Sequence, residues 1–299
     1  MKIAKSGRLM AAALVAVCAP AAAAADTIFG LTANNRIVTF NAATPGTTLS
    51  DRAITGLAPG DQLLGIDRRP VDRMLYALGS SGNLYRLTNG SSGYVASNLG
   101  ALSTALTGSS HGFDFNPTVD RLRVVSDANQ NLRINPNTMP PGTIVDSALT
   151  LNGLAPFDLL AVAYTNSIAG ATSTMLFGID ARSGGLVRST NANAGTYVST
   201  NPMGMAYQSL GLPLDNAQKL GFDITPYFNV GYFNFDDQLY RVDLRTGAPT
   251  LMGSIAAGSL VGFAAGSVPE PQSWALMIAG FGLVGAAQRR RRLPVRAVA

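Results

Sequence analysis

The 299-residue sequence contains 22 Lys and Arg residues against 17 Asp and Glu residues, a balance that would suit a nucleic-acid or anionic-membrane partner. The positive charge is concentrated at the two ends, with Lys2, Lys5 and Arg8 near the start and five arginines among the last eleven residues. Residues 26–269 carry 14 basic and 16 acidic side chains, so the body has a net charge of −2 and no basic excess that would predict binding to DNA or RNA.

The first 25 residues have the three parts of a secretory signal peptide. Basic residues precede an apolar stretch over residues 9–19, and a run of alanines ends at Ala25. We expect export through the Sec translocon and cleavage by signal peptidase between Ala25 and Asp26. The apolar run is too short for a permanent transmembrane helix. Cleavage also removes Cys18, the only cysteine, so the exported body has neither a disulfide nor thiol chemistry.

Residues 26–267 are expected to form one all-β domain. This segment is rich in Gly, Asn, Thr and Ser, and it contains short apolar or β-branched runs with hardly any helical periodicity. Turn residues separate these runs at roughly the 8–12-residue spacing that is typical of all-β folds.

A self-similar phrase recurs three times in this body. Residues 64–70 read LGIDRRP, residues 111–117 read HGFDFNP, and residues 220–224 read LGFDI. A second apolar run, an Arg-containing run and a fourth run follow each phrase. Four strands in about 40–47 residues is the size of one β-propeller blade.

Two further units complete a predicted ring. Residues 159–190 form a degenerate copy that lacks the Gly and the Asp of the phrase. Residues 260–264 look like a first strand with nothing after it, whereas residues 28–55 supply three strands with none before them. The sequence therefore predicts a five-bladed β-propeller of four-stranded blades, closed by pairing of the N- and C-terminal strands. A six-bladed ring that uses residues 201–218 and a β-sandwich are the alternatives.

The body also resembles a bacterial family, domain of unknown function 4394. The phrases GFDFNPTVDR at residues 112–121 and GATST at residues 170–174 carry the resemblance, which spans residues 26–266. The resemblance implies no catalytic residue, cofactor or substrate.

Asp67, Asp114 and Asp223 occupy the same place in the three repeated phrases. On the innermost strands of a propeller they would surround the axis, where three carboxylates could hold a hard cation such as Ca²⁺. Alternatively, each carboxylate accepts hydrogen bonds from backbone N–H groups of its own turn. We favour this second interpretation, because Ala163 or Tyr164 in the fourth copy and Ala264 in the closing copy interrupt a five-fold metal ring.

Residues 108–112, GSSHG, match the G-x-S-x-G pattern of a nucleophile elbow. An elbow needs a strand-to-helix turn in an α/β sheet, so we interpret His111, the only histidine, as a loop or blade-edge residue. One histidine without a mature cysteine also excludes a Cys and His zinc cluster. These features favour a binding or structural role over catalysis. The alternative is a secreted hydrolase or lyase that acts on a polysaccharide or a small ester.

The chain changes character at residue 268. The tail contains, in order, Pro269, Glu270, Pro271, Trp274 and Ala275, an apolar Gly-rich segment that ends at residue 287, and Arg289, Arg290, Arg291 and Arg292. Trp at one end and Arg at the other are typical anchors of a transmembrane helix, with the arginines in the cytoplasm. The apolar span of roughly 14–16 residues is shorter than the usual ~20, which suits a temporary anchor.

This order of elements resembles the PEP-CTERM sorting domain. The resemblance implies that residues 268–299 hold the protein in the inner membrane until an exosortase cuts near the Pro-Glu-Pro motif, in bacteria that make extracellular polysaccharide. The expected product is a cell-surface or extracellular protein without enzymatic activity, with a role linked to exopolysaccharide.

Overall fold

The computed structural model describes residues 26–154, 157–215, 220–267, 279–283 and 285. Residues 25–268 form a compact unit separate from the two ends of the chain. The signal peptide with Ala25, the Pro-Glu-Pro and Trp-Ala motifs and the four-arginine cluster lie outside the described residues. Asp26, the predicted first residue after cleavage, begins the first strand of the body.

Only a short part of the predicted membrane anchor is described. Residues 279–283 and 285 are helical. Within the described part of the chain, no helix has the length and apolarity needed to cross a membrane. The remaining residues of the predicted apolar span lie outside the described residues.

The described residues of the body form 21 strands in four sheets, which confirms the all-β prediction. The largest sheet has the spatial order β21 (Gly262–Ser267), β1 (Asp26–Leu31), β2 (Arg36–Asn41), β3 (Thr48–Thr55), β7 (Tyr94–Ala101), β6 (Asn83–Asn89), β5 (Leu75–Gly79) and β4 (Leu63–Arg68). All its neighbours are antiparallel except β3 and β7, which pair in parallel over Ile54–Tyr94 and Thr55–Val95 alone. This sheet therefore consists of two four-stranded groups joined at their outer strands.

The other three sheets each contain one further group. The second sheet has the order β11 (Gly142–Val145), β10 (Asn131–Asn135), β9 (Arg121–Ser126) and β8 (His111–Asn116). The third has the order β12 (Thr150–Leu151), β16 (Thr196–Val198), β15 (Gly185–Asn191), β14 (Leu176–Asp180) and β13 (Leu159–Tyr164). The fourth has the order β17 (Phe222–Ile224), β18 (Gly231–Phe235), β19 (Gln238–Val242) and β20 (Pro249–Ser254).

The two ends of the body pair with each other, as predicted. Strands β1 and β21 are antiparallel, with Asp26 opposite Ser267 and Leu31 opposite Gly262. One strand group is thus built from the last strand of the body and its first three strands. This pairing gives β21 its backbone partner and gives β1 a second partner beside β2.

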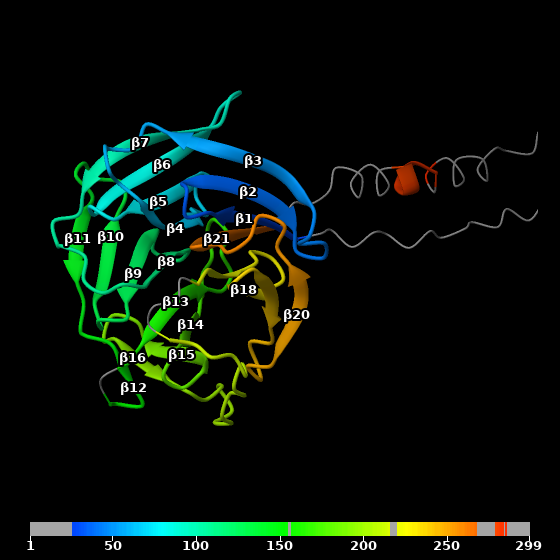
Figure 1. Cartoon of the computed structure of the whole chain (residues 1–299). Helices are drawn as coiled ribbons and strands as arrows, with labels where there is room; N and C mark the ends of the chain where they lie inside the picture. Colours follow the sequence, from blue (N-terminus) through cyan, green and yellow to red (C-terminus); the bar gives the residue numbers. More distant parts are fainter. Residues whose placement is uncertain (1–25, 155–156, 216–219, 268–278, 284, 286–299) are drawn as a thin grey trace, which may run out of the picture. The chain divides into compact units, whose positions relative to one another are not determined.

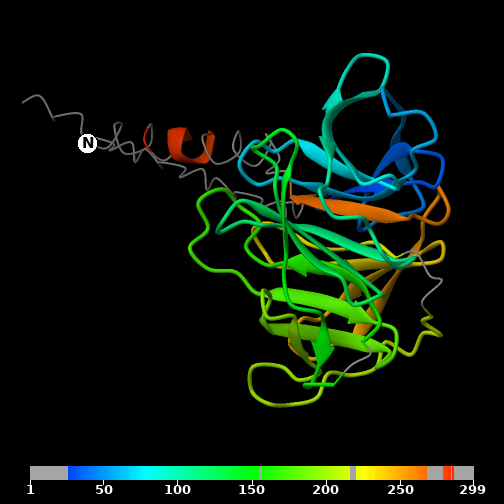
Figure 2. The same ribbon diagram turned by 90° about the vertical axis from the view of Figure 1, so that its left-hand side faces the viewer.

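One edge strand of each group faces the centre of the body. These five inner strands are β4, β8, β13, β17 and β21, and each contacts the next in this order, with β21 returning to β4. Figure 1 shows the sheets arranged around this common centre, and Figure 2 shows them from the side. The order of the groups around the centre follows their order in the sequence.

The hydrophobic core lies between neighbouring groups. One cluster joins Tyr76 and Leu78 of β5 to Phe115 and Val124 of the next group, all of them buried. The rings of Tyr76 and Phe115 meet edge to face with their centroids 5.2 Å apart. Burial of each such side chain contributes about 1.5–3 kcal/mol, so the groups depend on one another for stability.

Candidate functional site at the centre of the body

The inner strands approach one another closely because glycines precede the aspartates by two positions. A Cβ atom on Gly112 of β8 would lie 2.9 Å from the backbone nitrogen of Val162 on β13. A Cβ atom on Gly221, next to β17, would lie 2.7 Å from the backbone nitrogen of Phe263 on β21. Both distances are too short for any other residue, and this explains why Gly recurs in the repeated phrase.

Each aspartate of the phrase bonds to the next inner strand. Asp67 Oδ2 accepts the backbone N–H of Phe115 on β8 at 2.8 Å. Asp114 Oδ1 accepts the N–H of Tyr164 on β13 at 3.1 Å. Asp223 Oδ2 accepts the N–H of Ala265 on β21 at 2.5 Å. Three of the five contacts between neighbouring inner strands therefore include a hydrogen bond from a backbone N–H to an aspartate side chain.

The positions of these three bonds also identify the residues that replace aspartate in the other two copies. The N–H groups that the aspartates bind belong to Phe115, Tyr164 and Ala265. Phe115 directly follows the aspartate of its own copy of the phrase, Asp114. By the same offset, Ala163, rather than Tyr164, takes the place of the aspartate in the fourth copy, and Ala264 takes it in the closing copy. The contacts from β13 to β17 and from β21 to β4 consequently have no aspartate at this position to accept a hydrogen bond from the next strand.

The structure brings Asp67, Asp114 and Asp223 together at the centre. One oxygen of each lies within 4.8 Å of an oxygen of the others, and the three residues are only 2–3% exposed. The interpretation of local turn bonds was right in part, because Asp67 Oδ1 accepts the N–H of Arg68 and Asp223 Oδ1 accepts that of Ile224. The convergence and the bonds to the neighbouring strands go beyond that interpretation.

Burial is the main influence on the charge of this cluster. It raises the pKa of Asp67 to about 6, against opposing hydrogen bonds from Phe115 and Arg68. Burial, and then the negative charge of Asp67, raise the pKa values of Asp114 and Asp223 well above the ordinary range. At neutral pH the cluster therefore retains at least one proton, because three charges at this spacing would repel one another without solvent screening.

The three carboxylates are the residues that could hold a metal ion. Their spacing would allow a small cation to bind through oxygen ligands. However, five of their six oxygens already accept backbone N–H groups. Three of these bonds join neighbouring inner strands and two go to the next residue of the same strand. Protons shared within the cluster would reduce its charge in the same way as a bound cation.

Two cavities near the same centre have volumes of about 10 Å³ each. One of these cavities is lined by residues from all five inner strands, among them Gly65, Gly112, Ala161, Phe222 and Gly262. A cavity of this volume has room for about one water molecule. Neither of these two cavities has room for a sugar ring or an ester.

His111 lies near this centre on β8, an inner edge strand of its group, so it is a strand residue and not a loop residue. It is the first residue of β8 and lines both small cavities. The phrase itself contained the signal, because His111 takes the place of Leu64 and Leu220 in the other copies. Ser109, two positions before His111, donates a hydrogen bond from its Oγ to Asp127 Oδ2 at 2.7 Å.

Sequence reasoning missed a buried arginine between two strand groups. Arg123 of β9 is 2% exposed and forms an ion pair with Asp146 at 2.9 Å. Its guanidinium also donates to Asn131, Asn193 and the hydroxyl of Tyr164. These partners are far apart in the sequence, so no local motif could have predicted the network.

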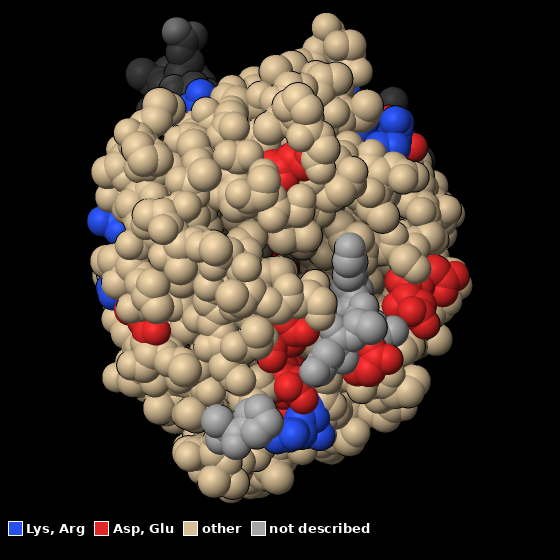
Figure 3. All heavy atoms as spheres, turned by 60° about the vertical axis from the view of Figure 1, so that its left-hand side comes forward, with Lys and Arg blue, Asp and Glu red and all other residues tan. Residues whose placement is uncertain are grey.

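Charged side chains are sparse on the face shown in Figure 3, and they form no continuous basic surface there. This distribution agrees with the near-neutral net charge of the body.

Two family comparisons match the chain. The family model described as Domain of unknown function (DUF4394) matches residues 36–264. The chain belongs to this family. A PEP-CTERM protein-sorting motif matches residues 267–292, in agreement with the resemblance of the tail. No curated protein matches the DUF4394 chain.

Solved structures resemble the DUF4394 chain at low identity. A structural genomics protein of unknown function from Bacteroides thetaiotaomicron is 16% identical with a TM-score of 0.47, over 77% of this chain and 58% of that one. Glutaminyl cyclase from Myxococcus xanthus is 11% identical with a TM-score of 0.41, over 72% and 95%. A chain of a nidogen/laminin complex is 11% identical with a TM-score of 0.42, over 82% and 99%. The chain thus spans less than two thirds of the first of these proteins.

Proposed function

We propose that the chain is a cell-surface or extracellular-matrix protein that acts by binding, with exopolysaccharide as its partner. The sorting motif at residues 267–292 carries the proposal, because it indicates an exported protein that is anchored at the membrane and processed by an exosortase. The link to exopolysaccharide comes from the resemblance of the tail to the PEP-CTERM sorting domain, which implies a bacterium that makes extracellular polysaccharide.

The proposed architecture is a five-bladed β-propeller. Five four-stranded groups support it, together with inner strands that contact one another in a cycle. The pairing of β1 with β21 supplies the closing blade. In this architecture the short strand β12 is an addition to the outer edge of the fourth blade, where it pairs in parallel with β16.

The centre of this propeller has a structural role in the proposal. The aspartates there bond to backbone N–H groups of adjacent blades, and the cavities beside them have volumes of about 10 Å³ each. This supports recognition at the outer surface rather than catalysis on the axis, because a substrate would need far more room, at least about 300 Å³.

The experiment is replacement of Glu270 by Ala in the Pro-Glu-Pro motif, carried out in the native bacterium. We expect the wild-type chain to lose its C-terminal residues and to leave the membrane fraction, and we expect the variant to stay there uncut. Immunoblots of membrane, surface and medium fractions, with mass spectrometry of the C-terminus, measure this. The processed wild-type chain should also co-purify with the exopolysaccharide fraction.

The matched control is Gln272→Ala, a neutral change just outside the motif that should leave processing unchanged. Cleavage of the Glu270→Ala chain at the wild-type rate would contradict exosortase processing. Normal processing without retention in the exopolysaccharide fraction would contradict the binding role while leaving the sorting route intact.

A further inference from the structure

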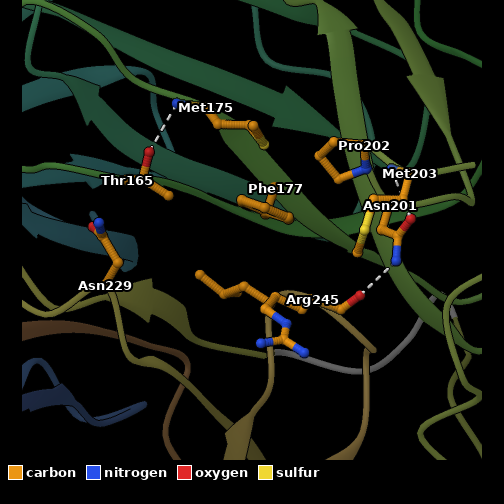
Figure 4. A pocket seen from close by; sticks show the side chains of 9 residues that line it. Thr165, Met175, Phe177, Asn201, Pro202, Met203, Asn229 and Arg245 are labelled. Carbon is orange, nitrogen blue, oxygen red and sulfur yellow. Dashed lines mark hydrogen bonds between the residues drawn. The ribbon is translucent and has the colours of Figure 1, made fainter.

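A pocket of about 300 Å³ opens between the fourth and fifth strand groups (Figure 4). Its apolar lining includes Met175 and Phe177 from one group, Leu244 from the other, and Met203 from the connection between the groups. This volume is at the lower end of the range for small-molecule sites in proteins. It is also much larger than either cavity at the centre of the body.

One wall of the pocket is a loop with its own internal support. Asn201 is 3% exposed, and its Oδ1 accepts the backbone N–H groups of Met203 at 3.0 Å and Met205 at 3.1 Å. Its Nδ2 donates to the backbone carbonyl of Arg245 at 2.9 Å, a bond that is drawn in Figure 4. The loop is therefore fixed to the neighbouring group before any ligand binds. It belongs to the stretch of residues 201–218 that the repeat pattern left unexplained.

The polar side chains along the pocket wall already have partners. Thr165 Oγ1 accepts the backbone N–H of Met175 at 2.8 Å. Asn229 exchanges two hydrogen bonds with Asn166, at 2.7 and 2.8 Å. With these groups satisfied, the interior offers mainly apolar contact, and methionine side chains can adapt to different apolar shapes.

A positive charge stands opposite this apolar wall. Arg245 lies across the pocket from Met175 and Phe177 in Figure 4. Among the residues that the structure describes, none forms an ion pair or a hydrogen bond with its guanidinium. The nearest acid in the sequence, Asp243, uses its Oδ1 to accept the backbone N–H of Arg245 at 2.7 Å.

We propose that this pocket binds a small amphipathic carboxylate, with an apolar ring or short chain against Met175, Phe177 and Leu244 and the carboxylate at Arg245. A guanidinium matches a carboxylate in geometry as well as in charge. This site is independent of the sorting route and of any polysaccharide bound elsewhere.

The test uses 4-phenylbutyrate and its neutral counterpart 4-phenylbutan-1-ol as probes of the full chain, with ¹³C-labelled methionine methyl groups followed by NMR. We expect saturable shifts of the Met175 and Met203 signals, while Met74 and Met139, which do not line the pocket, stay in place. The acid should bind about three- to fivefold more tightly than the alcohol, the effect of one exposed ion pair.

Two variants make the test specific. Arg245→Gln should remove the advantage of the acid and leave the affinity for the alcohol unchanged, whereas Arg86→Gln, an exposed arginine on β6, should change neither. Leu244→Trp should fill the pocket and weaken both probes, with the Met74 and Met139 signals as the check of folding. Unshifted Met175 and Met203 signals, equal binding of the two probes to wild type, or unweakened binding to the folded Leu244→Trp variant would each overturn the proposal.

Discussion

Two buried tyrosines differ in what their hydroxyl groups meet. Tyr85 donates to Asp61 Oδ2 at 2.6 Å and accepts the backbone N–H of Ala58 at 3.1 Å. Tyr197 is 1% exposed, and no residue in the described part of the chain forms a hydrogen bond with its hydroxyl. A buried polar group without a partner costs about 1–3 kcal/mol relative to its exposure in the unfolded chain.

Tyr197→Phe should therefore raise the free energy of unfolding by about 1 kcal/mol, because it removes the unpaired hydroxyl and keeps the ring contact with Phe157. Urea unfolding of the full chain measures the change from the midpoint and slope.

Tyr85→Phe is the matched control for this change. It removes a hydrogen bond to a carboxylate and should lower the free energy of unfolding by about 1.5–3 kcal/mol. If Tyr197→Phe were as destabilising as Tyr85→Phe, the hydroxyl of Tyr197 would have to make a bond that stabilises the fold.

At the scale of the strands, the close approach of β8 and β13 depends on a missing side chain. A Cβ atom at Gly112 would lie 2.7 Å from Val125 Cγ2 and 2.9 Å from the backbone nitrogen of Val162. Gly112→Ala should therefore lower the free energy of unfolding by about 2–3 kcal/mol, the cost of overpacking against a backbone that cannot move alone. Thermal unfolding of the full chain measures the loss as a lower Tm.

Gly46→Ala is the matched control for Gly112→Ala. The nearest atom to its added Cβ is the carbonyl oxygen of Ser254 at 3.7 Å, an ordinary contact. Its Tm should be unchanged or slightly higher, because Ala restricts the unfolded chain more than Gly does. Equal Tm values for both variants would show that β8 and β13 can separate at no cost.

The repeated phrase explains how far the sequence could predict these strands. Three of the five inner strands contain it, and its spacing placed the three aspartates at equivalent positions, although the favoured interpretation was a separate turn for each carboxylate and not their convergence. The strands β13 and β21 had to be inferred from the length of the copy and from the unpaired ends, because Ala163 and Ala264 replace the aspartates.

The features that the sequence did not predict depend on contacts between distant segments. Arg123 resembles any surface arginine of a strand until Asp146 and Asn193 fold around it. Likewise, the loop at Asn201 is attached to the next group by a hydrogen bond from this side chain to the backbone carbonyl of Arg245, 44 residues away. Local periodicity contains no information on such pairs.

For the whole molecule, the buried carboxylates make the stability of the five strand groups depend on pH. The pKa of Asp67 is raised by burial from its ordinary value of 3.8 to about 6, so the folded state binds this proton more tightly than the unfolded chain does. Stability from this group is fully present below about pH 4 and is lost as pH rises through about 6. The raised pKa values of Asp114 and Asp223 act in the same direction.

Other groups oppose this trend in acid. Burial alone would raise the pKa of Asp61, but hydrogen bonds from Tyr85, Ser81 and Asn83 lower it to about 2. The hydrogen bond from Arg69 likewise lowers the pKa of Asp120. The stability that Asp61 and Asp120 contribute is present above the ordinary Asp pKa of 3.8 and is lost as pH falls below it. We therefore expect the free energy of unfolding to be largest near pH 4–5.

The Asp67→Asn variant tests the central role of the cluster. Between pH 4.5 and 7, ionisation of Asp67 should lower the free energy of unfolding of the wild type by about 2 kcal/mol. The positive charge of the neighbouring Arg68 lowers the pKa of Asp67 and is included in this value. The variant should start lower, because the Asn Nδ2 cannot accept an N–H group, and its stability should depend less on pH in this window. Asp51→Asn, an exposed carboxylate on β3, is the control with the same change of charge.

Thermal unfolding from pH 4 to 8, with EDTA and with millimolar Ca²⁺, separates shared protons from a bound cation. If protons reduce the charge of the cluster, the wild-type profile is the same in both solutions, and its slope decreases only in Asp67→Asn. A rise in Tm with Ca²⁺ at pH 7.5 that disappears in the variant would instead make the three aspartates cation ligands, because an ion that binds only the folded state stabilises it. The Asp cluster would then hold the strand groups together through the ion as well as through its backbone hydrogen bonds.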